Sequence, residues 1–305
     1  MLKIEDLKVA LDADAGLVKA IDGMRLSIER GETFALVGES GCGKSMTALA
    51  LMRLLPENGN VTAGRVMVGH NENEMIDVLG LPESGMRAVR GGRIGMIFQE
   101  PSTSLNPVMR IGQQIVEAIE AHTDLRGAAA RTKAIDWLRR VGIPEPERRI
   151  DEYPFRMSGG QKQRVMIAMT LAAAPDFLVA DEPTTALDVT IQKQILDLLV
   201  GLQKRTGMGL VLITHDMGVV AETADRVQVM YAGQMVEEAA TADLFRAPRH
   251  PYTAALLDAL PERAMGRHRL PTIPGVVPGI DDRPGGSAGP SSSWPRSASP
   301  SRSGA

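Results

Sequence analysis

The chain has few aromatic residues and one cysteine, and each scarcity excludes classes of protein. Phe, Trp and Tyr make up 3% of its 305 residues, so Val, Ile, Leu, Met and Ala have to fill any core. A single cysteine, Cys42, excludes an internal disulfide, a zinc site built on cysteines and an iron–sulfur cluster held within the chain. The reducing cytoplasm is the simplest compartment for such a chain.

Long apolar runs and an excess of charge are also lacking. The longest nearly apolar stretch, residues 165–175, has eleven residues, whereas a helix that spans a bilayer needs about 20. The acidic N-terminal segment MLKIEDLKVALDADAG has no apolar core of a signal peptide. A net charge of −3 without a basic block argues against a nucleic-acid partner. We therefore expect any membrane role to go through a partner protein.

Short apolar runs alternate with helical patterns along most of the chain. The expected strands are residues 2–9, 24–28, 33–37, 61–68, 93–98, 177–180, 210–214, 226–231 and 234–237. The expected helices are residues 45–55, 164–174, 189–205 and 217–223, with a short helical appendage at 241–263. This alternation predicts an α/β fold, with a mixed sheet covered by helices on both faces.

Two segments depart from this alternation. Residues 107–163 have helical periodicity, for example at Ile111, Ile115 and Ile119, and predict a helical subdomain inserted in the α/β core. Residues 281–305 contain eight Ser, four Gly and four Pro but no Leu, Ile, Val or Phe. Such a segment cannot bury enough apolar surface to offset its ordering entropy, so we expect it to be disordered.

The segment GESGCGKS at residues 38–45 fits the phosphate-binding pattern GxxxxGK[ST], between an expected buried strand and a helix. Its glycines let backbone N–H groups turn toward phosphate oxygens, and the helix N-terminus adds the positive end of its dipole. Lys44 is expected to reach the β- and γ-phosphates and the Ser45 hydroxyl to ligate Mg²⁺. The predicted nucleotide-binding residues of this segment are Gly38, Ser40, Gly41, Cys42, Gly43, Lys44, Ser45 and Met46.

The strand expected at 177–180 runs into two carboxylates, Asp181 and Glu182. Beside a phosphate-binding loop, Asp181 is expected to hold Mg²⁺. Glu182 is placed to polarise the attacking water as a general base. Two acids after a strand are weak evidence alone, so this interpretation depends on the preceding loop.

The segment MSGGQ at residues 157–161 precedes a helix and is similar to the LSGGQ signature of the ATP-binding-cassette (ABC) family, with Met157 replacing Leu. Gln99 then matches the family's Q-loop, Asp188 its D-loop and His215 its switch histidine. These motifs stand in the family's order over residues 1–240. The resemblance implies a head-to-tail dimer in which each ATP lies between the phosphate-binding loop of one subunit and the signature of the other.

The resemblance also assigns roles to these residues. Gln99 would ligate Mg²⁺ and report nucleotide occupancy to a membrane partner, and His215 would contact the γ-phosphate and orient the water of Glu182. The implied catalytic residues are Lys44, Gln99, Glu182 and His215. The implied contacts from the signature and D-loop are Ser158, Gly159, Gly160, Gln161 and Asp188.

Several stretches, among them FQEPSTSLNPV (98–108) and HPYTAALLDALP (250–261), resemble the ATPases of dipeptide, oligopeptide and nickel importers. This implies a cassette over residues 1–247, an importer-type extension over 248–280 and the tail over 281–305. It also implies three kinds of partner: a second cassette, identical or paralogous, two transmembrane permease subunits and, indirectly, an extracytoplasmic solute-binding protein. The resemblance also implies that the chain is a peripheral subunit on the cytoplasmic face of the bacterial inner membrane.

Two departures from the importer pattern stand out. Residues 10–20 lack the aromatic that the family commonly stacks on adenine, so Leu11, Leu17 or Val18 would offer only an aliphatic contact. After the PGVVP segment at 274–278, the chain lacks the cysteines that can hold an iron–sulfur cluster in such importers. We expect ATP and Mg²⁺ as cofactors and no iron–sulfur cluster.

Three other functions are weighed against an importer ATPase. A soluble ABC ATPase acting on DNA or ribosomes typically has long coiled-coil insertions or two cassettes, and this chain has neither sustained heptads nor a basic patch. A non-catalytic regulatory cassette is disfavoured by the presence of Lys44, Asp181, Glu182 and His215. A P-loop kinase would lack the series formed by SGGQ, the paired acids and the histidine.

Overall fold

The computed structural model describes residues 1–13, 16–185 and 187–260. The strands are β1 Leu2–Ala13, β2 Gly16–Ile28, β3 Thr33–Val37, β4 Gly59–Val68, β5 Ile76–Asp77, β6 Ile94–Ile97, β7 Phe177–Asp181, β8 Gly209–Thr214, β9 Arg226–Tyr231 and β10 Gln234–Ala240. The α-helices are α1 Lys44–Leu51, α2 Glu83–Val89, α3 Pro101–Ser104, α4 Ile111–His122, α5 Gly127–Arg140, α6 Pro146–Arg149, α7 Gly159–Ala172, α8 Val189–Thr206, α9 Met217–Thr223, α10 Thr241–Arg246 and α11 Pro251–Asp258. Three 3₁₀ turns, η1 Glu72–Glu74, η2 Val78–Gly80 and η3 Pro154–Arg156, lie between them.

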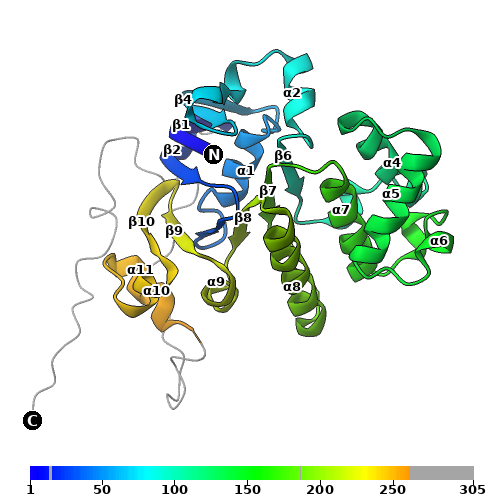
Figure 1. The fold of residues 1–305 in the computed structure, drawn as a ribbon. Coiled ribbons are helices and arrows are strands. Elements are labelled where there is room, and N and C mark those ends of the chain that lie inside the picture. The colour runs from blue at the N-terminus through cyan, green and yellow to red at the C-terminus, as the bar shows by residue number, and fades with distance from the viewer. Residues whose placement is uncertain (14–15, 186, 261–305) are drawn as a thin grey trace, which may run out of the picture.

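The strands form two sheets (Figure 1). The larger sheet has the order β10-β9-β3-β8-β7-β6, and its neighbours are parallel except for the antiparallel pair β9 and β10. The smaller sheet, in the order β2-β1-β4-β5, is antiparallel throughout. The predicted α/β fold with a mixed sheet is confirmed, and the separate antiparallel sheet adds to it.

The parallel strands β3, β6, β7 and β8 are buried along their whole length, which explains why they are apolar runs in the sequence. In β7, Phe177 and Val179 point into the core between the two sheets, whereas Leu178 and Ala180 point into the core on the opposite face. Strand β8 alternates between the same two cores. Side chains of successive strand residues point to opposite faces, so one short strand contributes to both cores.

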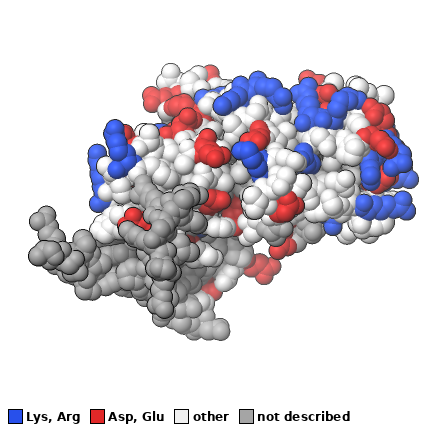
Figure 2. All heavy atoms as spheres, turned by 90° about the horizontal axis from the view of Figure 1, so that it is seen from below, with Lys and Arg blue, Asp and Glu red and all other residues white. Residues whose placement is uncertain are grey.

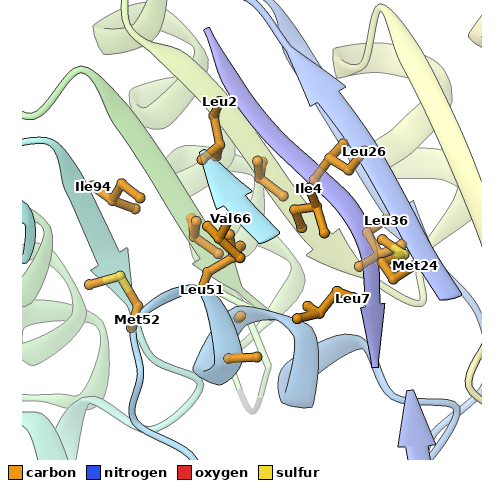
Figure 3. Packing of buried hydrophobic residues seen from close by; sticks show 14 of the residues in the cluster. Leu2, Ile4, Leu7, Met24, Leu26, Leu36, Leu51, Met52, Val66 and Ile94 are labelled. Atoms are coloured by element: carbon orange, nitrogen blue, oxygen red, sulfur yellow. The ribbon is translucent and has the colours of Figure 1, made fainter. Parts of the chain in front are cut away.

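The first face is covered by α1 and the antiparallel sheet. Figure 3 shows Leu51 of α1 beside Val66 of β4, and Leu36 of β3 beside Met24 of β2; all four belong to one buried cluster. Helix α1 is therefore fixed between two sheets. This matters for function because α1 begins directly after the glycine-rich loop.

The opposite face is covered by helices. Helices α7 and α8 pack on it, and α4 to α6 form a helical lobe beside them, at the right of Figure 1. Ile111, Ile115 and Ile119 of α4 are fully buried, as their spacing predicts. Figure 2 shows acidic and basic side chains interspersed over this lobe. Several pair with each other, for example Arg131 with Asp151 at 2.7 Å.

Some predicted boundaries are wrong. Helix α1 ends at Leu51 rather than residue 55, because Arg53 adopts a left-handed backbone conformation with φ 51°. Strand β2 begins at Gly16 rather than residue 24, because cross-strand pairs such as Leu11 with Val18 continue the ladder with β1. The appendage consists of α10 and α11. The expected tail over 281–305, and the extension beyond residue 260, lie outside the described residues.

The packing of α4 generates a stability prediction. A Cβ on Gly112 would lie 2.2 Å from Cγ1 and 2.6 Å from the carbonyl oxygen of Ile150, so Gly112→Ala forces the helical lobe apart. We expect it to lower the free energy of unfolding by about 1–3 kcal/mol. In contrast, Gly201→Ala inside α8 meets nothing within 4 Å and is expected to stabilise by about 1 kcal/mol. Urea unfolding of both variants checks this, and a Gly112→Ala protein as stable as the unchanged chain would contradict it.

Candidate functional site

The loop between β3 and α1 wraps around a buried ammonium group. Lys44 is 4% exposed, and its Nζ donates hydrogen bonds to the carbonyl oxygens of Gly38 at 2.8 Å and Glu39 at 2.9 Å. A buried charge is costly unless it is hydrogen-bonded, so these bonds hold the loop in a tight curve. Gly38 has no space for a side chain there, because a Cβ would lie 2.2 Å from the carbonyl oxygen of Met230.

A cavity of about 530 Å³ opens where this loop meets the N-terminus of α1. It is lined by Ala20, Gly38, Glu39, Ser40, Gly41, Gly43, Lys44, Ser45, Met46, Gln99, Glu182, His215 and Leu256. The helix N-terminus and Lys44 together favour an anionic ligand. The structure thus brings most of the predicted phosphate-binding residues to one cavity.

Cys42 is the exception within the predicted loop. Its side chain is fully buried in the core between the two sheets, and its backbone N–H donates to the carbonyl oxygen of Glu39 at 3.3 Å. A buried thiol behaves as a small apolar side chain. It contributes packing to the loop, and its Sγ also accepts a hydrogen bond from Lys44 Nζ at 3.8 Å.

Ser45 and Asp181 form an oxygen pair beside the cavity. The Ser45 hydroxyl donates to Oδ1 of Asp181 at 3.0 Å, and Asp181 is 5% exposed. Burial raises the pKa of the Asp181 carboxyl above its ordinary value, despite the hydrogen bond from Ser45. Among the described residues, no group of three or more His, Cys, Asp or Glu is placed to hold a metal. Two hard oxygen atoms fit Mg²⁺, which takes its remaining ligands from water and phosphate.

Glu182 lies at the end of β7, where three side chains converge on its carboxylate. Thr185 Oγ1 donates at 2.8 Å and Gln99 Nε2 at 3.3 Å, and Nδ1 of His215 lies 3.2 Å away. Partial burial opposes ionisation, but hydrogen bonds from Thr185 and His215 outweigh it and lower the pKa of Glu182. An ionised carboxylate facing the cavity is the group that can accept a proton from water.

The structure therefore brings Gln99, Glu182 and His215 together, as the motifs predict. Gln99 donates its amide to Glu182, so in this structure it contacts the predicted base rather than Asp181. Thr185 was missed by the sequence reasoning. Its position three residues after Glu182, within DEPTT, was the available signal.

The predicted signature lies elsewhere. Ser158 caps α7 through a reciprocal pair: its Oγ accepts from the Gln161 backbone at 3.3 Å, and its own backbone donates to Gln161 Oε1 at 3.1 Å. Ser158 and Gly159 are exposed, and residues 158–161 are not among the described residues that line the cavity. Asp188 is likewise exposed and caps α8 through Ile191. One chain thus presents two separate parts of the expected site.

The aliphatic contact with adenine expected from Leu11, Leu17 or Val18 stays a prediction. Among the described residues of this segment, 10–13 and 16–20, Ala20 lines the cavity, whereas Val18 is 7% exposed and Leu11 packs against the core between the sheets. Leu17 is 67% exposed. The register of β1 and β2 shifts between Val9 and Ala10, opposite Ala20, so the regular alternation of β2 is interrupted there. Neither this irregularity nor the extent of β2 was visible in the sequence.

These features define a class of protein, the P-loop nucleoside triphosphatases. A family model described as "ABC transporter" matches residues 21–185, and one described as "Oligopeptide/dipeptide transporter, C-terminal region" matches residues 236–288. The chain belongs to the ABC transporter family, as an ATP-binding cassette with ATPase activity coupled to transport. The family resemblance drawn from the motifs is confirmed.

Curated relatives are similar over most of their length. The chain is 51% identical to a "Probable peptide ABC transporter ATP-binding protein" of Sinorhizobium fredii, over 92% of this chain and 83% of the relative. It is 49% identical to a "Dipeptide transport ATP-binding protein" of Haemophilus influenzae, over 94% of this chain and 85% of the relative.

A solved structure is similar in fold. The dimeric, post-hydrolysis ATP-binding cassette MJ0796 bound to ADP and Pi matches with a TM-score of 0.69 and 27% identity, over 79% of this chain and 99% of that chain. Within the part of the present chain that the structure describes, no helix is long and apolar enough to cross a membrane.

The contacts of Glu182 predict a change in pH dependence. Thr185→Val removes a hydrogen bond to the ionised carboxylate, so the pKa of Glu182 rises. If Glu182 is the base, more of it is then protonated at low pH, and the acid limb of the ATPase rate moves to higher pH. Rates of the assembled transporter measured between about pH 5 and 9 check this. Thr184→Val, the same change one residue earlier, is the control, and an unmoved limb in Thr185→Val would count against the prediction.

Proposed function

We propose that the chain is the ATP-hydrolysing subunit of an importer for di- and oligopeptides. The observation that carries the substrate class is the match of residues 236–288 to the C-terminal region of oligopeptide and dipeptide transporters. The names of the relatives support the same class, since they are described as peptide and dipeptide transport proteins. The extension over 248–280 is part of this proposal, as is the cassette over 1–247 with its helical subdomain at about 107–163.

In this proposal the triphosphate lies on the loop at 38–45. Its backbone N–H groups and Lys44 take the phosphate charge, and Ser45 and Asp181 hold Mg²⁺, which would neutralise charge developing on the phosphates. The Glu182 carboxylate accepts the proton of the attacking water. His215 orients that carboxylate from 3.2 Å, and Gln99 and Thr185 fix it on its other oxygen.

The rest of the site comes from a second cassette, identical or paralogous. Support comes from Ser158, Gly159 and Asp188, which are exposed and are not among the described residues that line the chain's own cavity. ABC cassettes dimerise and work with transmembrane permease subunits. Here we propose two permease subunits, an extracytoplasmic solute-binding protein that feeds them, and a peripheral position on the cytoplasmic face of the bacterial inner membrane.

The proposed base predicts a separation of binding from turnover. Glu182→Gln keeps the shape and hydrogen-bonding reach of the side chain but cannot take a proton, so we expect ATP binding to persist while turnover falls by about 10²–10⁴-fold. Lys44→Ala is expected to weaken binding as well, because it removes the buried ammonium group. Nucleotide titration and steady-state ATPase of the assembled complex measure both effects. Normal turnover in Glu182→Gln would show that another group is the base.

The proposed substrate class is tested by uptake. The chain is co-expressed with its permease and solute-binding protein, and uptake of labelled dipeptide, pentapeptide and nickel is measured, with Glu182→Gln as the inactive control. We expect saturable peptide uptake that Glu182→Gln abolishes. Uptake of nickel alone would overturn peptide import while leaving the ATPase assignment intact.

A further inference from the structure

Helix α11, in the C-terminal region, contacts the phosphate-binding loop directly. The hydroxyl of Tyr252 accepts a hydrogen bond from the backbone N–H of Glu39 at 3.1 Å, across 213 positions of sequence. Tyr252 is fully buried, and Leu256, one turn later on the same helix, lines the nucleotide cavity. The C-terminal region therefore borders the candidate ATP site.

Glu39 is held from two sides by bonds of different kinds. Its carbonyl oxygen accepts from Lys44 Nζ at 2.9 Å, and its N–H donates to Tyr252. A bound triphosphate competes for Lys44, since this lysine reaches phosphate oxygens in such loops. The bond to Tyr252 involves neither Lys44 nor a ligand atom, so it does not depend on where the ammonium group points. It is thus suited to keeping the first residues of the loop in place during binding.

Helix α11 is itself anchored to the larger sheet. The Glu237 carboxylate of β10 accepts hydrogen bonds from the backbone N–H groups of Arg249 at 2.8 Å and His250 at 2.9 Å, just before α11. Burial opposes the ionisation of Glu237, but these hydrogen bonds outweigh it and lower its pKa. The ring centroid of Tyr231, at the end of β9, lies 4.7 Å from the ring centroid of Tyr252. A continuous path of contacts therefore runs from β10 through α11 to the loop.

We propose that Tyr252 is a positioning residue for ATP binding: its hydroxyl fixes Glu39, so that the C-terminal region sets the affinity of the phosphate-binding loop. The proposal rests on the function proposed above, in which ATP occupies this loop. The hydroxyl of Tyr252 affects recognition of the phosphates and does not act on Glu182, the proposed general base.

Tyr252→Phe is the direct test, because it keeps the ring against Tyr231 and removes one oxygen atom. We expect the Kd for ATP to rise about two- to tenfold, because the half-buried N–H of Glu39 loses the hydroxyl that accepts its hydrogen bond. ADP and GTP are expected to weaken by the same factor as ATP. The KM for ATP of the assembled transporter should rise in parallel, while kcat at saturating ATP stays unchanged. An unchanged Kd, or a loss confined to kcat, would overturn the proposal.

Two further variants separate the hydroxyl from general loosening of the helix. Leu257→Val trims a fully buried side chain of the same helix and leaves the hydroxyl in place, so its Kd should match that of the unchanged chain. An equal rise in Leu257→Val would mean that packing, and not the hydrogen bond, sets the affinity. Glu237→Gln should raise the Kd alone but add nothing to Tyr252→Phe, since both act through one contact. If the losses of affinity in the two single variants add fully in the double variant, Glu237 does not act through Tyr252.

ATP binding by the unchanged full chain distinguishes a failure of the proposed function from a failure of the inference about Tyr252. If it binds no ATP, the proposed function fails, whatever Tyr252 does. If it binds ATP with the same Kd as Tyr252→Phe, the proposed function stands and the inference about Tyr252 fails.

Discussion

The site depends on the parallel register of β3, β8 and β7. Val37 pairs with Thr214 and Ile213 with Asp181, so the three strands end level with one another. The loop at 38–45, Glu182 and His215 follow these ends directly, and Asp181 is the last residue of β7. Because side chains alternate along a strand, a shift of one residue in β7 would turn Asp181 to the other face and lose its 3.0 Å contact with Ser45. The buried ladder is thus what sets the chemistry at its edge.

The helical lobe gives the molecule its second functional part. Helix α7 packs on the lobe and on the sheet within one core, so its N-terminus is held rigidly although it lies away from the cavity. The capping box at Ser158 leaves this end pre-ordered and exposed. ABC cassettes dimerise, and in the proposed function this exposed end completes the site of a second cassette.

Local patterns were enough to predict the parts of the site that are local. The loop at 38–45 follows from a strand, a run of glycines and a helix in sequence, and Asp181 from its place at the end of an apolar strand. Contacts between distant segments were not predictable in this way. Tyr252 carries no sign in HPYTAALL that it reaches Glu39, and the hairpin that places Ala20 in the cavity is extended by residues of low strand propensity, such as Ala13 and Gly16.

The burial of Cys42 has a practical consequence. The chain's one cysteine lies beneath the phosphate-binding loop with no exposed surface, where a helix N-terminus would otherwise favour a reactive thiolate. A thiol reagent can reach it only while the loop is lifted from the core. The rate at which a thiol reagent labels Cys42 therefore measures how often the loop opens. A ligand that stabilises the closed loop is expected to slow this labelling.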